Sequence, residues 1–579
     1  MASAWIKSSF RPSRPNRLPR RNNLAFSLDL GPAFPSRRSP VFGRGGMVAS
    51  SQPLATAAGL EILSQGGNAA DAAVATAAAL NVTEPTSTGL GGDMFALFYE
   101  ATTGQVTALN GSGRAPASLT LDLLRKNGLT ELPPYHPYTI TVPGACAGWC
   151  DLIERHGTLS LPAVLAPAIR LADEGFPVAP VTSHFWRRAA ERQLKESLNG
   201  REMTIGGRGP NPGELFRNPG LARTLKTIAA GGKKAYYEGE IAEVIAGTVQ
   251  QAGGCLTVDD LAAHVSTWDE PISTSCGGLR LWECPPNGQG ITALLALNIL
   301  EGLDLPSDPL SADCLHLEIE ALRLAFADTR WYVADPRVVR VPIDELISKE
   351  YAAERRKLID PKKATIDQQR GTPVAGSDTV YFCVVDKWGN ACSFINSNYM
   401  GFGTGIVPHG WGFTLQNRGH NFSLEPGHPN VLAPGKRPYH TIIPAMITRE
   451  ADGSLFGPMG VMGGFMQPQG HLQIFLALAQ GLDPQSALDM PRFCIGDGTA
   501  GGVVPIPGRG GEVTLEDGIL ADTIADLTRR GHPVREVTGW ERALFGRGQV
   551  ILRDPATGVL TAGSDPRADG CAMTLVSYG

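Results

Sequence analysis

The sequence lacks the features of several large protein classes. No apolar run approaches the roughly 18 residues that span a bilayer, because Asp71 interrupts the alanine-rich stretch 69–80, so no membrane span is expected. The ten cysteines include no C-x-x-C pair and no zinc-type spacing, which favours free thiols in a reducing compartment. The formal net charge is only −5, and no long basic run lies outside the N-terminus, so no nucleic-acid partner is expected.

Common catalytic motifs are also missing. The chain contains no H-E-x-x-H and no G-x-S-x-G, and its eleven histidines include no i, i+4 pair that could share a metal ion. The glycines of 89–92 lack the Lys and Ser/Thr of a phosphate-binding loop, and they precede a strand rather than a helix. We therefore expect no metal and no cofactor.

The first 32 residues differ from the rest of the chain. Prolines break any helical period there, and the first acid, Asp29, comes only after Arg11, Arg14, Arg17, Arg20 and Arg21. We predict a disordered basic tail over 1–32. The apolar segment of a secretory signal is missing, which leaves a cytoplasmic location as the expectation. Two alternatives stay open, namely an organelle transit peptide and a start codon placed too far upstream.

The remaining residues have the composition of a globular protein, with 42% hydrophobic and 18% charged side chains. Small residues at helical spacing predict two helices, one including residues 55–62 and one over 69–80, and apolar runs around residues 93–99 and 106–109 predict a hairpin. Further helices are predicted over 159–179, 224–251, 256–264 and 311–327. Since the strand-like runs cluster at both ends, the pattern favours layered α and β over strict βαβ alternation.

At Thr379 the sequence changes from polar, turn-forming residues to apolar, strand-forming residues. Residues 360–378 are polar and rich in turn formers, which predicts a linker. The sequence T-V-Y-F-C-V-V-D then starts at Thr379, turns at K-W-G-N and returns as A-C-S-F-I-N-S, which predicts a hairpin. A threonine at the head of a strand is ordinarily only a β-branched residue in a suitable place, so its position alone does not indicate catalysis.

The ordered motifs of residues 33–579 resemble those of the gamma-glutamyltransferases and their gamma-glutamyltransferase-like relatives. The small subunit of that family begins with a threonine, a strand ending V-V-D, a G-N turn and F-G-x-G-I-V, and residues 379–407 match this order and spacing. Further matches are S-Q-P-L-A at Ser51, G-G-N-A-A-D-A at Gly66, G-L-G-G-D at Gly89, P-P-N-G-Q-G at Pro285, L-A-P-G-K-R-P at Leu432, M-G-G at Met462 and S-D-P-R at Ser564.

The resemblance implies an α+β fold, a four-layer αββα sandwich of the N-terminal-nucleophile type. It also implies a proenzyme cleaved between Asp378 and Thr379 into a large subunit, 33–378, and a small subunit, 379–579. These fragments are expected to stay together as one intertwined domain, a heterodimer of the chain's own products. Cleavage frees the α-amine of Thr379, whose pKa of roughly 8 suits a general base acting on its own hydroxyl.

The resemblance assigns three further catalytic positions. The family's oxyanion hole is a Gly-Gly backbone pair, which falls on Gly463 and Gly464; a helix-start turn is the alternative interpretation of the same residues. Ser397 occupies the position of the family's second threonine, which hydrogen-bonds the nucleophile. Tyr399 takes the place of a family asparagine near the substrate.

Substrate-binding positions depart from the transferase pattern. The arginine that binds the glutamyl α-carboxylate aligns with Ser112, and Arg114 lies two residues later. The aspartate that holds the α-ammonium becomes Asn421, and the supporting Ser-Ser pair becomes His440 and Thr441. Arg114 and Arg418 remain available to bind a carboxylate, although each could equally be an arginine unrelated to substrate.

The leading hypothesis is a self-processing gamma-glutamyl hydrolase or transferase that acts on glutathione or gamma-glutamyl amides through an acyl-threonine, with water, an amino acid or a peptide as acceptor. One alternative is an amide hydrolase or acylase of another small carboxylate-bearing amide, as in the gamma-glutamyltransferase-like branch. Another is a non-catalytic scaffold that keeps the fold without turnover. Two chains on a denaturing gel would distinguish an enzyme from a scaffold.

Overall fold

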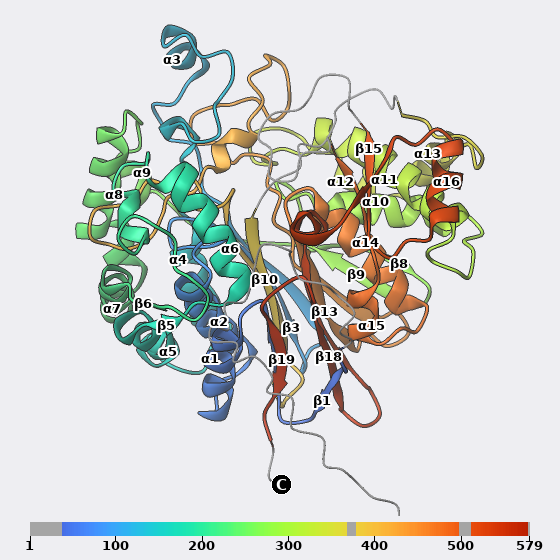
Figure 1. The fold of residues 1–579 in the computed structure, drawn as a ribbon, viewed down its shortest axis with the longest axis horizontal. Coiled ribbons are helices and arrows are strands. Elements are labelled where there is room, and N and C mark those ends of the chain that lie inside the picture. The colour runs from blue at the N-terminus through green and yellow to red at the C-terminus, as the bar shows by residue number, and fades with distance from the viewer. Residues whose placement is uncertain (1–37, 367–377, 497–510, 577–579) are drawn as a thin grey trace, which may run out of the picture.

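Two seven-stranded sheets pack face to face, and helices cover the outer face of each sheet (Figure 1). The computed structural model describes residues 38–366, 378–496 and 511–576. The predicted tail 1–32 and most of the predicted linker lie outside these residues.

The first sheet, named here the β10 sheet, is antiparallel and contains the strand that begins the predicted small subunit. In spatial order its strands are β19 (Cys571–Thr574), β2 (Met47–Ser50), β10 (Asp378–Val385), β11 (Ala391–Tyr399), β3 (Asp93–Glu100), β4 (Gln105–Gly111) and β7 (Thr267–Asp269). Gly389, at φ +89°, makes the turn that joins β10 to β11, as the G-N pair predicts.

The second sheet, named here the β13 sheet, is also antiparallel. In spatial order its strands are β1 (Val41–Gly43), β18 (Leu560–Ser564), β17 (Arg547–Arg553), β13 (Leu455–Met462), β12 (Ala445–Arg449), β9 (Leu279–Glu283) and β8 (Ile272–Cys276). Residues before and after position 379 therefore contribute strands to both sheets.

The central strands are apolar on both faces because both faces are covered. Along β10, Val380 and Phe382 belong to the core beneath the helices, whereas Tyr381 and Cys383 belong to the core between the two sheets. This alternation follows from the two-residue period of a strand. By the same alternation, Thr379 lies on the side of β10 that faces the β13 sheet.

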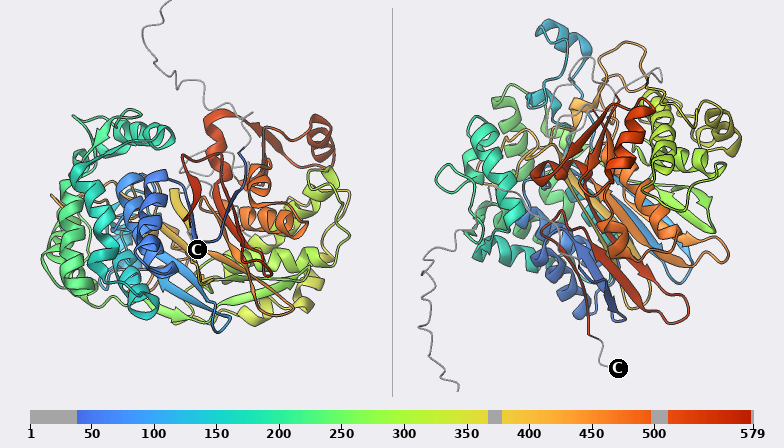
Figure 2. Two further views of the ribbon diagram at one scale, coloured as in Figure 1. Left: turned by 90° about the horizontal axis from the view of Figure 1, so that it is seen from below. Right: turned by 45° about the vertical axis from the view of Figure 1, so that its right-hand side comes forward.

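Helices form the two outer layers (Figure 2). The β10 sheet is covered by α1 (Pro53–Ser64), α2 (Ala69–Thr83), α4 (Ala145–His156), α5 (Leu161–Glu174), α7 (Pro219–Tyr237) and α8 (Glu240–Gln251). The β13 sheet is covered by α10 (Gly290–Glu301), α11 (Ala312–Tyr332), α13 (Lys349–Arg356), α14 (Met466–Ala479), α15 (Pro484–Asp489) and α16 (Ala521–Arg529). The four-layer αββα sandwich is thus confirmed.

Smaller elements lie around these layers. They are α3 (Leu121–Lys126), α6 (Pro180–Ala189), α9 (Val258–Ala262), α12 (Ile343–Leu346), the pair β5 (Phe176–Pro177) and β6 (Leu215–Phe216), and a sheet of β14 (Phe493–Gly496), β15 (Glu512–Glu516) and β16 (Val534–Val537). All ten cysteines are free thiols.

Most predicted elements occur, and three of the predicted helices differ in their bounds. The helix predicted over 224–251 is the pair α7 and α8, because the chain breaks at Glu238 and Gly239 while the apolar period continues on both sides. The helix predicted over 159–179 ends at Glu174, where Gly175 adopts φ +92°. The helix predicted over 311–327 continues to Tyr332, which brings Arg330 and Trp331 onto its last turn.

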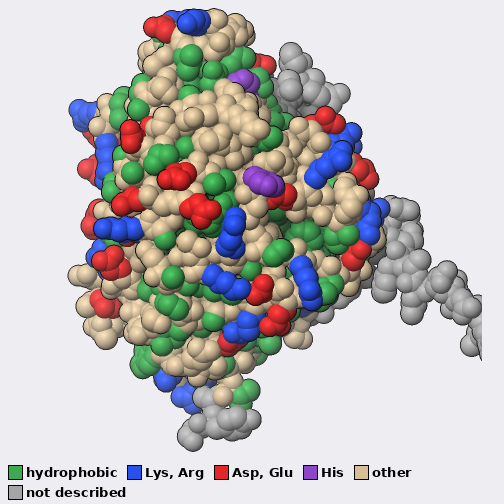
Figure 3. Space-filling model, turned by 90° about the vertical axis from the view of Figure 1, so that its left-hand side faces the viewer, with side chains coloured by type: hydrophobic (Ala, Val, Ile, Leu, Met, Phe, Trp, Pro, Cys, Tyr) green, Lys and Arg blue, Asp and Glu red, His purple; other side chains and the backbone are tan. Residues whose placement is uncertain are grey.

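The outer surface carries charges of both signs. On the face shown in Figure 3, lysines and arginines alternate with acids, and no single-sign patch dominates. Among the described residues, no helix is both long and apolar enough to cross a membrane.

Close approach of α1 and α2 depends on small residues, and Gly59 is the tightest point. A Cβ added to Gly59 would lie 2.3 Å from Thr76 Oγ1 and 3.1 Å from a methyl carbon of Val48. Gly247 in α8 serves as a control position, because a Cβ added there would have no atom within 4 Å. The small-residue spacing of the sequence therefore sets the distance between this helix pair and the β10 sheet.

Replacing Gly59 by alanine should destabilise the fold by about 1–3 kcal/mol, because the added methyl overpacks the α1–α2 contact. Replacing Gly247 by alanine should instead stabilise it by up to about 1 kcal/mol, since alanine lowers the entropy of the unfolded chain. Urea unfolding of both variants tests the pair. Equal effects of the two substitutions would contradict the packing argument.

Candidate active site

Thr379 is fully buried at the start of β10, and its side chain contacts the neighbouring strand β11. Its Oγ1 lies 3.0 Å from Oγ of Ser397. The pairing of the two strands shifts register between Asp378 and Val380, so a bulge marks the bond at which cleavage is predicted. The structure thus brings the predicted nucleophile and the predicted second hydroxyl to hydrogen-bond distance.

Ser397 receives two hydrogen bonds. The backbone N–H of Tyr399 donates to its Oγ at 2.8 Å, and Nη2 of Arg418 donates at 3.1 Å. A serine oxygen has two lone pairs and one hydrogen. These two donors hold the serine oxygen beside Thr379, and either hydroxyl can donate in the contact between the two side chains.

Tyr399 has an unusual backbone. Its φ is +76°, which is a strained conformation for a bulky side chain and costs about 1–3 kcal/mol. The conformation turns the Tyr399 N–H back toward Ser397, while the buried ring lies 4.5 Å from the guanidinium carbon of Arg418. Burial raises the pKa of the Tyr399 hydroxyl to about 12, so the ring remains neutral at physiological pH.

Arg418 is buried at the first position of the 3₁₀ turn η5 (Arg418–Asn421). Its Nη1 donates to Thr441 Oγ1 at 2.6 Å, and its Nη2 donates to Ser397. Burial lowers its pKa to about 10, and the nearby Asp93 opposes that shift, so the guanidinium stays charged at neutral pH. Arg418 therefore positions the two hydroxyl side chains rather than facing solvent.

His440 pairs with Asp93 in the interior. Its Nε2 lies 3.0 Å from Asp93 Oδ2, and its Nδ1 lies 3.3 Å from the N–H of Ile442. Because a backbone N–H can only donate, Nδ1 accepts and the hydrogen sits on Nε2. Burial lowers the pKa of His440 to about 3, and the charge of Arg418 adds to this effect. His440 is thus a neutral donor to Asp93.

Gly463 and Gly464 connect β13 to α14 at φ values of +130° and +56°. Within the described residues, neither amide donates a hydrogen bond to the protein. The carbonyl of Gly464 accepts from Gln289 Nε2 at 2.8 Å, and the same nitrogen donates to the Thr441 carbonyl at 2.6 Å. The turn does precede a helix, as the alternative interpretation expects, and its amides can still serve an oxyanion.

Gln289 is a positioning residue that the sequence did not single out, although it belongs to the P-P-N-G-Q-G motif. It joins the Gly464 carbonyl to Thr441, whose hydroxyl in turn accepts from Arg418. The glycine turn and the hydroxyl pair are therefore linked through side chains far apart in sequence. Only the folded arrangement could show this connection.

Arg114 lies in a different environment from Arg418. Its Nη1 donates to the carbonyl of Val265 at 3.3 Å. Ser112 is buried, and its carbonyl accepts from Nε of Arg437 at 2.9 Å. No contact of Arg114 with Thr379, Ser397 or Arg418 occurs in the described structure. Its role in substrate binding stays a prediction.

Asn421 lies at the edge of a cavity of about 550 Å³. Its Nδ2 donates to the carbonyl of Tyr439 at 3.1 Å. The cavity walls combine aromatic and polar side chains and consist of Arg330, Trp331, Asn421, Phe422, Ser423, Glu425, His428, Asn430, Tyr439 and Phe465. Phe465 directly follows Gly464, so this cavity adjoins the candidate oxyanion hole.

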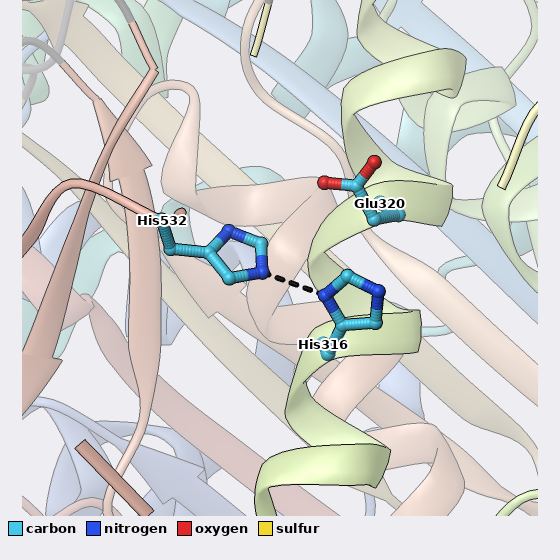
Figure 4. Close-up of side chains that lie close together, drawn as sticks. All are labelled: His316, Glu320 and His532. Atoms are coloured by element: carbon cyan, nitrogen blue, oxygen red, sulfur yellow. Dashed lines mark hydrogen bonds between the residues drawn. The ribbon is translucent and has the colours of Figure 1, made fainter. Parts of the chain in front are cut away.

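Within the part of the chain that the structure describes, one group of side chains has the geometry to share a metal ion, and two of its members lie near the N-terminal end of α11. Ligand atoms of His316, Glu320 and His532 come within 4.8 Å of one another (Figure 4). Arg323 also binds this group, since its Nη1 donates to Glu320 at 2.7 Å and to His532 Nδ1 at 3.1 Å. A bound cation would have to displace that guanidinium, so the donor set favours a hydrogen-bond chain.

Arg323 determines which atoms donate and which accept along this series of hydrogen bonds. Because Nδ1 of His532 accepts from the guanidinium, the ring donates through Nε2 to His316 Nδ1 at 2.7 Å. His316 Nε2 then donates to the carbonyl of Asp360 at 2.8 Å, and Glu320 accepts the N–H of Thr365 at 3.0 Å. The cluster therefore binds the backbone of Asp360 and Thr365, in the described part of the predicted linker 360–378.

Comparison with known proteins identifies the family of this chain. The family model named Gamma-glutamyltranspeptidase matches residues 55–575. The chain belongs to this family. Over 92% of its length it is 37% identical to the Glutathione hydrolase-like YwrD proenzyme of Bacillus subtilis (strain 168), of which it covers 99%. Over 91% it is 34% identical to the Oxamate amidohydrolase proenzyme of Klebsiella pneumoniae subsp. pneumoniae, of which it covers 98%.

A solved relative agrees with this placement. The crystal structure of cephalosporin acylase from Bacillus halodurans superposes with a TM-score of 0.86 at 46% identity, covering 94% of this chain and 98% of that chain. The N-terminal-nucleophile fold expected from the resemblance is thus confirmed, and the chain is an enzyme of the gamma-glutamyltranspeptidase family. Because these relatives are named for different amide substrates, membership gives the reaction type and leaves the substrate open.

The hydrogen bond between His316 and His532 predicts that the stability of the fold depends on pH. Burial, with the charges of Arg323 and Arg530, lowers the pKa of His532 to about 3, whereas an unfolded histidine titrates near 6.5. Below about pH 6.5 the unfolded state binds the extra proton, so the folded state loses stability as pH falls toward 3. Urea unfolding at pH 7 and pH 5 should show a smaller loss in His532→Gln than in the wild type. Equal losses would contradict this assignment.

Proposed function

We propose that the chain cuts its own peptide bond before Thr379 and that the new N-terminal threonine hydrolyses a small amide whose acyl group carries a carboxylate. One observation carries the proposal. The Thr379 and Ser397 hydroxyl oxygens lie 3.0 Å apart inside the sandwich, on the side of β10 that faces the β13 sheet. Membership of a family with proenzyme relatives supports the same interpretation.

Self-cleavage begins with attack of Thr379 Oγ1 on the carbonyl carbon of Asp378. The C–N bond breaks, the nitrogen takes the hydroxyl proton, and an ester joins Asp378 to the threonine oxygen. Water then hydrolyses the ester, which leaves a carboxylate on Asp378 and a free amine on Thr379. In the proposed step the Ser397 hydroxyl, 3.0 Å from the attacking oxygen, donates to it and stabilises the charge that develops there.

In turnover, the freed α-amine accepts the proton of its own hydroxyl, for which a pKa of roughly 8 is suitable. Thr379 attacks the substrate amide, and the amides of Gly463 and Gly464 stabilise the tetrahedral oxyanion, each donor contributing about 3–4 kcal/mol. The leaving amine receives the proton from the α-ammonium. Water, or an amine in the transfer reaction, then releases the acyl group from the threonine.

Two acyl groups compete as substrate. A gamma-glutamyl group has both an α-ammonium and an α-carboxylate, and glutathione is its most familiar amide. Asn421 is neutral at the family's aspartate position, and an amide oxygen binds an ammonium about half as strongly as a carboxylate does. His440 donates to Asp93 and Thr441 accepts from Arg418. These contacts favour, as second candidate, an acyl group with a carboxylate and no ammonium.

Self-cleavage predicts two fragments, one ending at Asp378 and one starting at Thr379. Thr379→Ala should remain full length by intact mass, because it lacks the attacking oxygen. Ser397→Ala should cleave about 10- to 100-fold more slowly, since one donor to that oxygen is lost, and Ser397→Thr should restore the rate. A wild-type chain that folds and stays whole would refute the proposal and favour the scaffold alternative.

Substrate choice can be tested with two anilides that differ only in the ammonium. Gamma-glutamyl 4-nitroanilide carries the α-amino group, and glutaryl 4-nitroanilide lacks it. With Asn421 in place, kcat/KM should be equal or higher for the glutaryl compound. Asn421→Asp should raise the value for the gamma-glutamyl compound by roughly 10-fold, the scale of a charge-assisted hydrogen bond. A wild-type preference of tenfold or more for gamma-glutamyl would instead identify a gamma-glutamyl enzyme.

A further inference from the structure

The glycine turn between β13 and α14 has little stiffness of its own, because glycine adopts left- and right-handed backbone conformations at similar cost. Gly463 and Gly464 have φ values of +130° and +56°. The carbonyl of Gly463 accepts from the N–H of Met466 at 2.9 Å, and the carbonyl of Gly464 accepts from the N–H of Gln467 at 3.2 Å. Both bonds stay within the turn and the start of α14. A contact with another element would hold the turn more firmly against the nucleophile.

Gln289 supplies such a contact. It is fully buried directly before α10, and its Nε2 donates to the carbonyls of Gly464 at 2.8 Å and Thr441 at 2.6 Å. Its own N–H donates to the His440 carbonyl at 3.0 Å, which holds its backbone beside the same segment. A carbonyl oxygen lies in the plane of its peptide unit, so the bond to Gly464 restricts the rotation of that unit.

Tyr439 orients the side-chain amide of Gln289. The Tyr439 hydroxyl donates to Oε1 of Gln289 at 3.1 Å. An amide oxygen accepts and an amide nitrogen donates, whereas the two backbone carbonyls can only accept, so one orientation of the amide satisfies all three partners. Burial raises the pKa of the Tyr439 hydroxyl, which therefore keeps its hydrogen at neutral pH.

The ring of Tyr439 belongs to a different part of the site. It lines the cavity of about 550 Å³, and its centroid lies 5.8 Å from that of Phe465, the residue after Gly464. A wall residue of the cavity is thus joined to the glycine turn by two hydrogen bonds, one from Tyr439 to Gln289 and one from Gln289 to Gly464.

We infer that Tyr439 and Gln289 are positioning residues of the reaction: the Tyr439 hydroxyl fixes the Gln289 amide, and Gln289 holds Gly464 in the conformation that binds the oxyanion. This inference rests on the proposed amide hydrolysis at Thr379. Because both residues act through the glycine amides, loss of their hydrogen bonds should weaken binding of the tetrahedral intermediate more than binding of the substrate. Acylation and deacylation both form an oxyanion, so kcat should fall while KM changes little.

The first test is turnover of whichever substrate the wild type prefers, gamma-glutamyl or glutaryl 4-nitroanilide. Gln289→Leu should lower kcat by roughly 10- to 100-fold, the scale of two lost hydrogen bonds. Tyr439→Phe keeps the ring in the cavity wall and should lower kcat by roughly 3- to 10-fold. KM should change less than about threefold in both variants. Intact mass should show that every variant assayed is processed.

Gln485 offers a matched control, because it is a buried glutamine with the same bonding pattern. Its Nε2 donates to the Ser564 carbonyl at 3.0 Å and to Asp489 at 2.8 Å, and its Oε1 accepts the N–H of Ser564 at 3.0 Å. These bonds join α15 to β18. Gln485→Leu should therefore lower the urea midpoint about as much as Gln289→Leu does, yet leave kcat within about twofold of the wild type. An equal fall of kcat in both variants would overturn the inference.

A boronate tests the oxyanion directly. The probe is 4-boronobutyrate if the wild type prefers glutaryl and 2-amino-4-boronobutyrate if it prefers gamma-glutamyl, with glutarate or glutamate as the matched acid. The Thr379 oxygen adds to boron, the α-amine takes its proton, and no bond to boron breaks. By calorimetry, Gln289→Leu should weaken boronate binding by roughly 10- to 100-fold and acid binding by less than about threefold. Tyr439→Phe should show a smaller effect of the same kind.

The outcomes separate this inference from the proposed reaction. Equal weakening of boronate and acid, or unchanged boronate binding in both variants, would overturn the positioning role. If Gln289→Leu fails to fold, Tyr439→Phe decides, because it removes a single hydroxyl. A processed wild type that hydrolyses neither anilide and binds the boronate no more tightly than the acid would instead refute the reaction at Thr379.

Discussion

The hydroxyl oxygen of Ser397 accepts hydrogen bonds from two N–H groups, and the arrangement of much of the candidate site depends on these two bonds. One group comes from Tyr399, which adopts φ +76° to present it. The other comes from Arg418, a buried guanidinium that also needs Thr441 and the ring of Tyr399 as neighbours. The serine oxygen is thereby held 3.0 Å from Oγ1 of Thr379. The strained backbone of Tyr399 and the buried charge of Arg418 therefore both serve to position this hydroxyl.

The face-to-face packing of two sheets brings the remaining parts together. The two-residue period of β10 and β11 points Thr379 and Ser397 toward the β13 sheet, where β13 ends at Met462 and the glycine turn begins. Gln289 holds that turn against Thr441. Helices cover the outer faces, so the polar groups lie in an interior where hydrogen bonds and charges act strongly. The sandwich therefore determines the distance between nucleophile and glycine amides.

Local sequence patterns predicted many of the helices and hairpins, but they did not predict the contacts between residues far apart in the sequence. The α1–α2 pair and the β3–β4 and β10–β11 hairpins were predictable, since small-residue spacing, alternation and turn residues are local signals. The resemblance supplied Thr379 and Ser397. Arg330 lies beyond the predicted end of its helix, and the partners of Gln289 are about 150 or more residues away along the chain. Ordered motifs predict a site's backbone positions better than they predict which arginine faces its cavity.

The strand order explains how the two fragments of a cleaved chain could stay associated. In the β10 sheet, β10 lies between β2, from before position 379, and β11, which in turn pairs with β3 from before it. In the β13 sheet, β18 pairs with β1 and β12 pairs with β9, again joining the two parts. Separating the fragments would break backbone ladders and expose both faces of each sheet. The proposed cleavage before Thr379 would therefore create a new C-terminus at Asp378 and a new N-terminus at Thr379, which supplies the amine that the reaction needs, while the fold that positions it stays assembled.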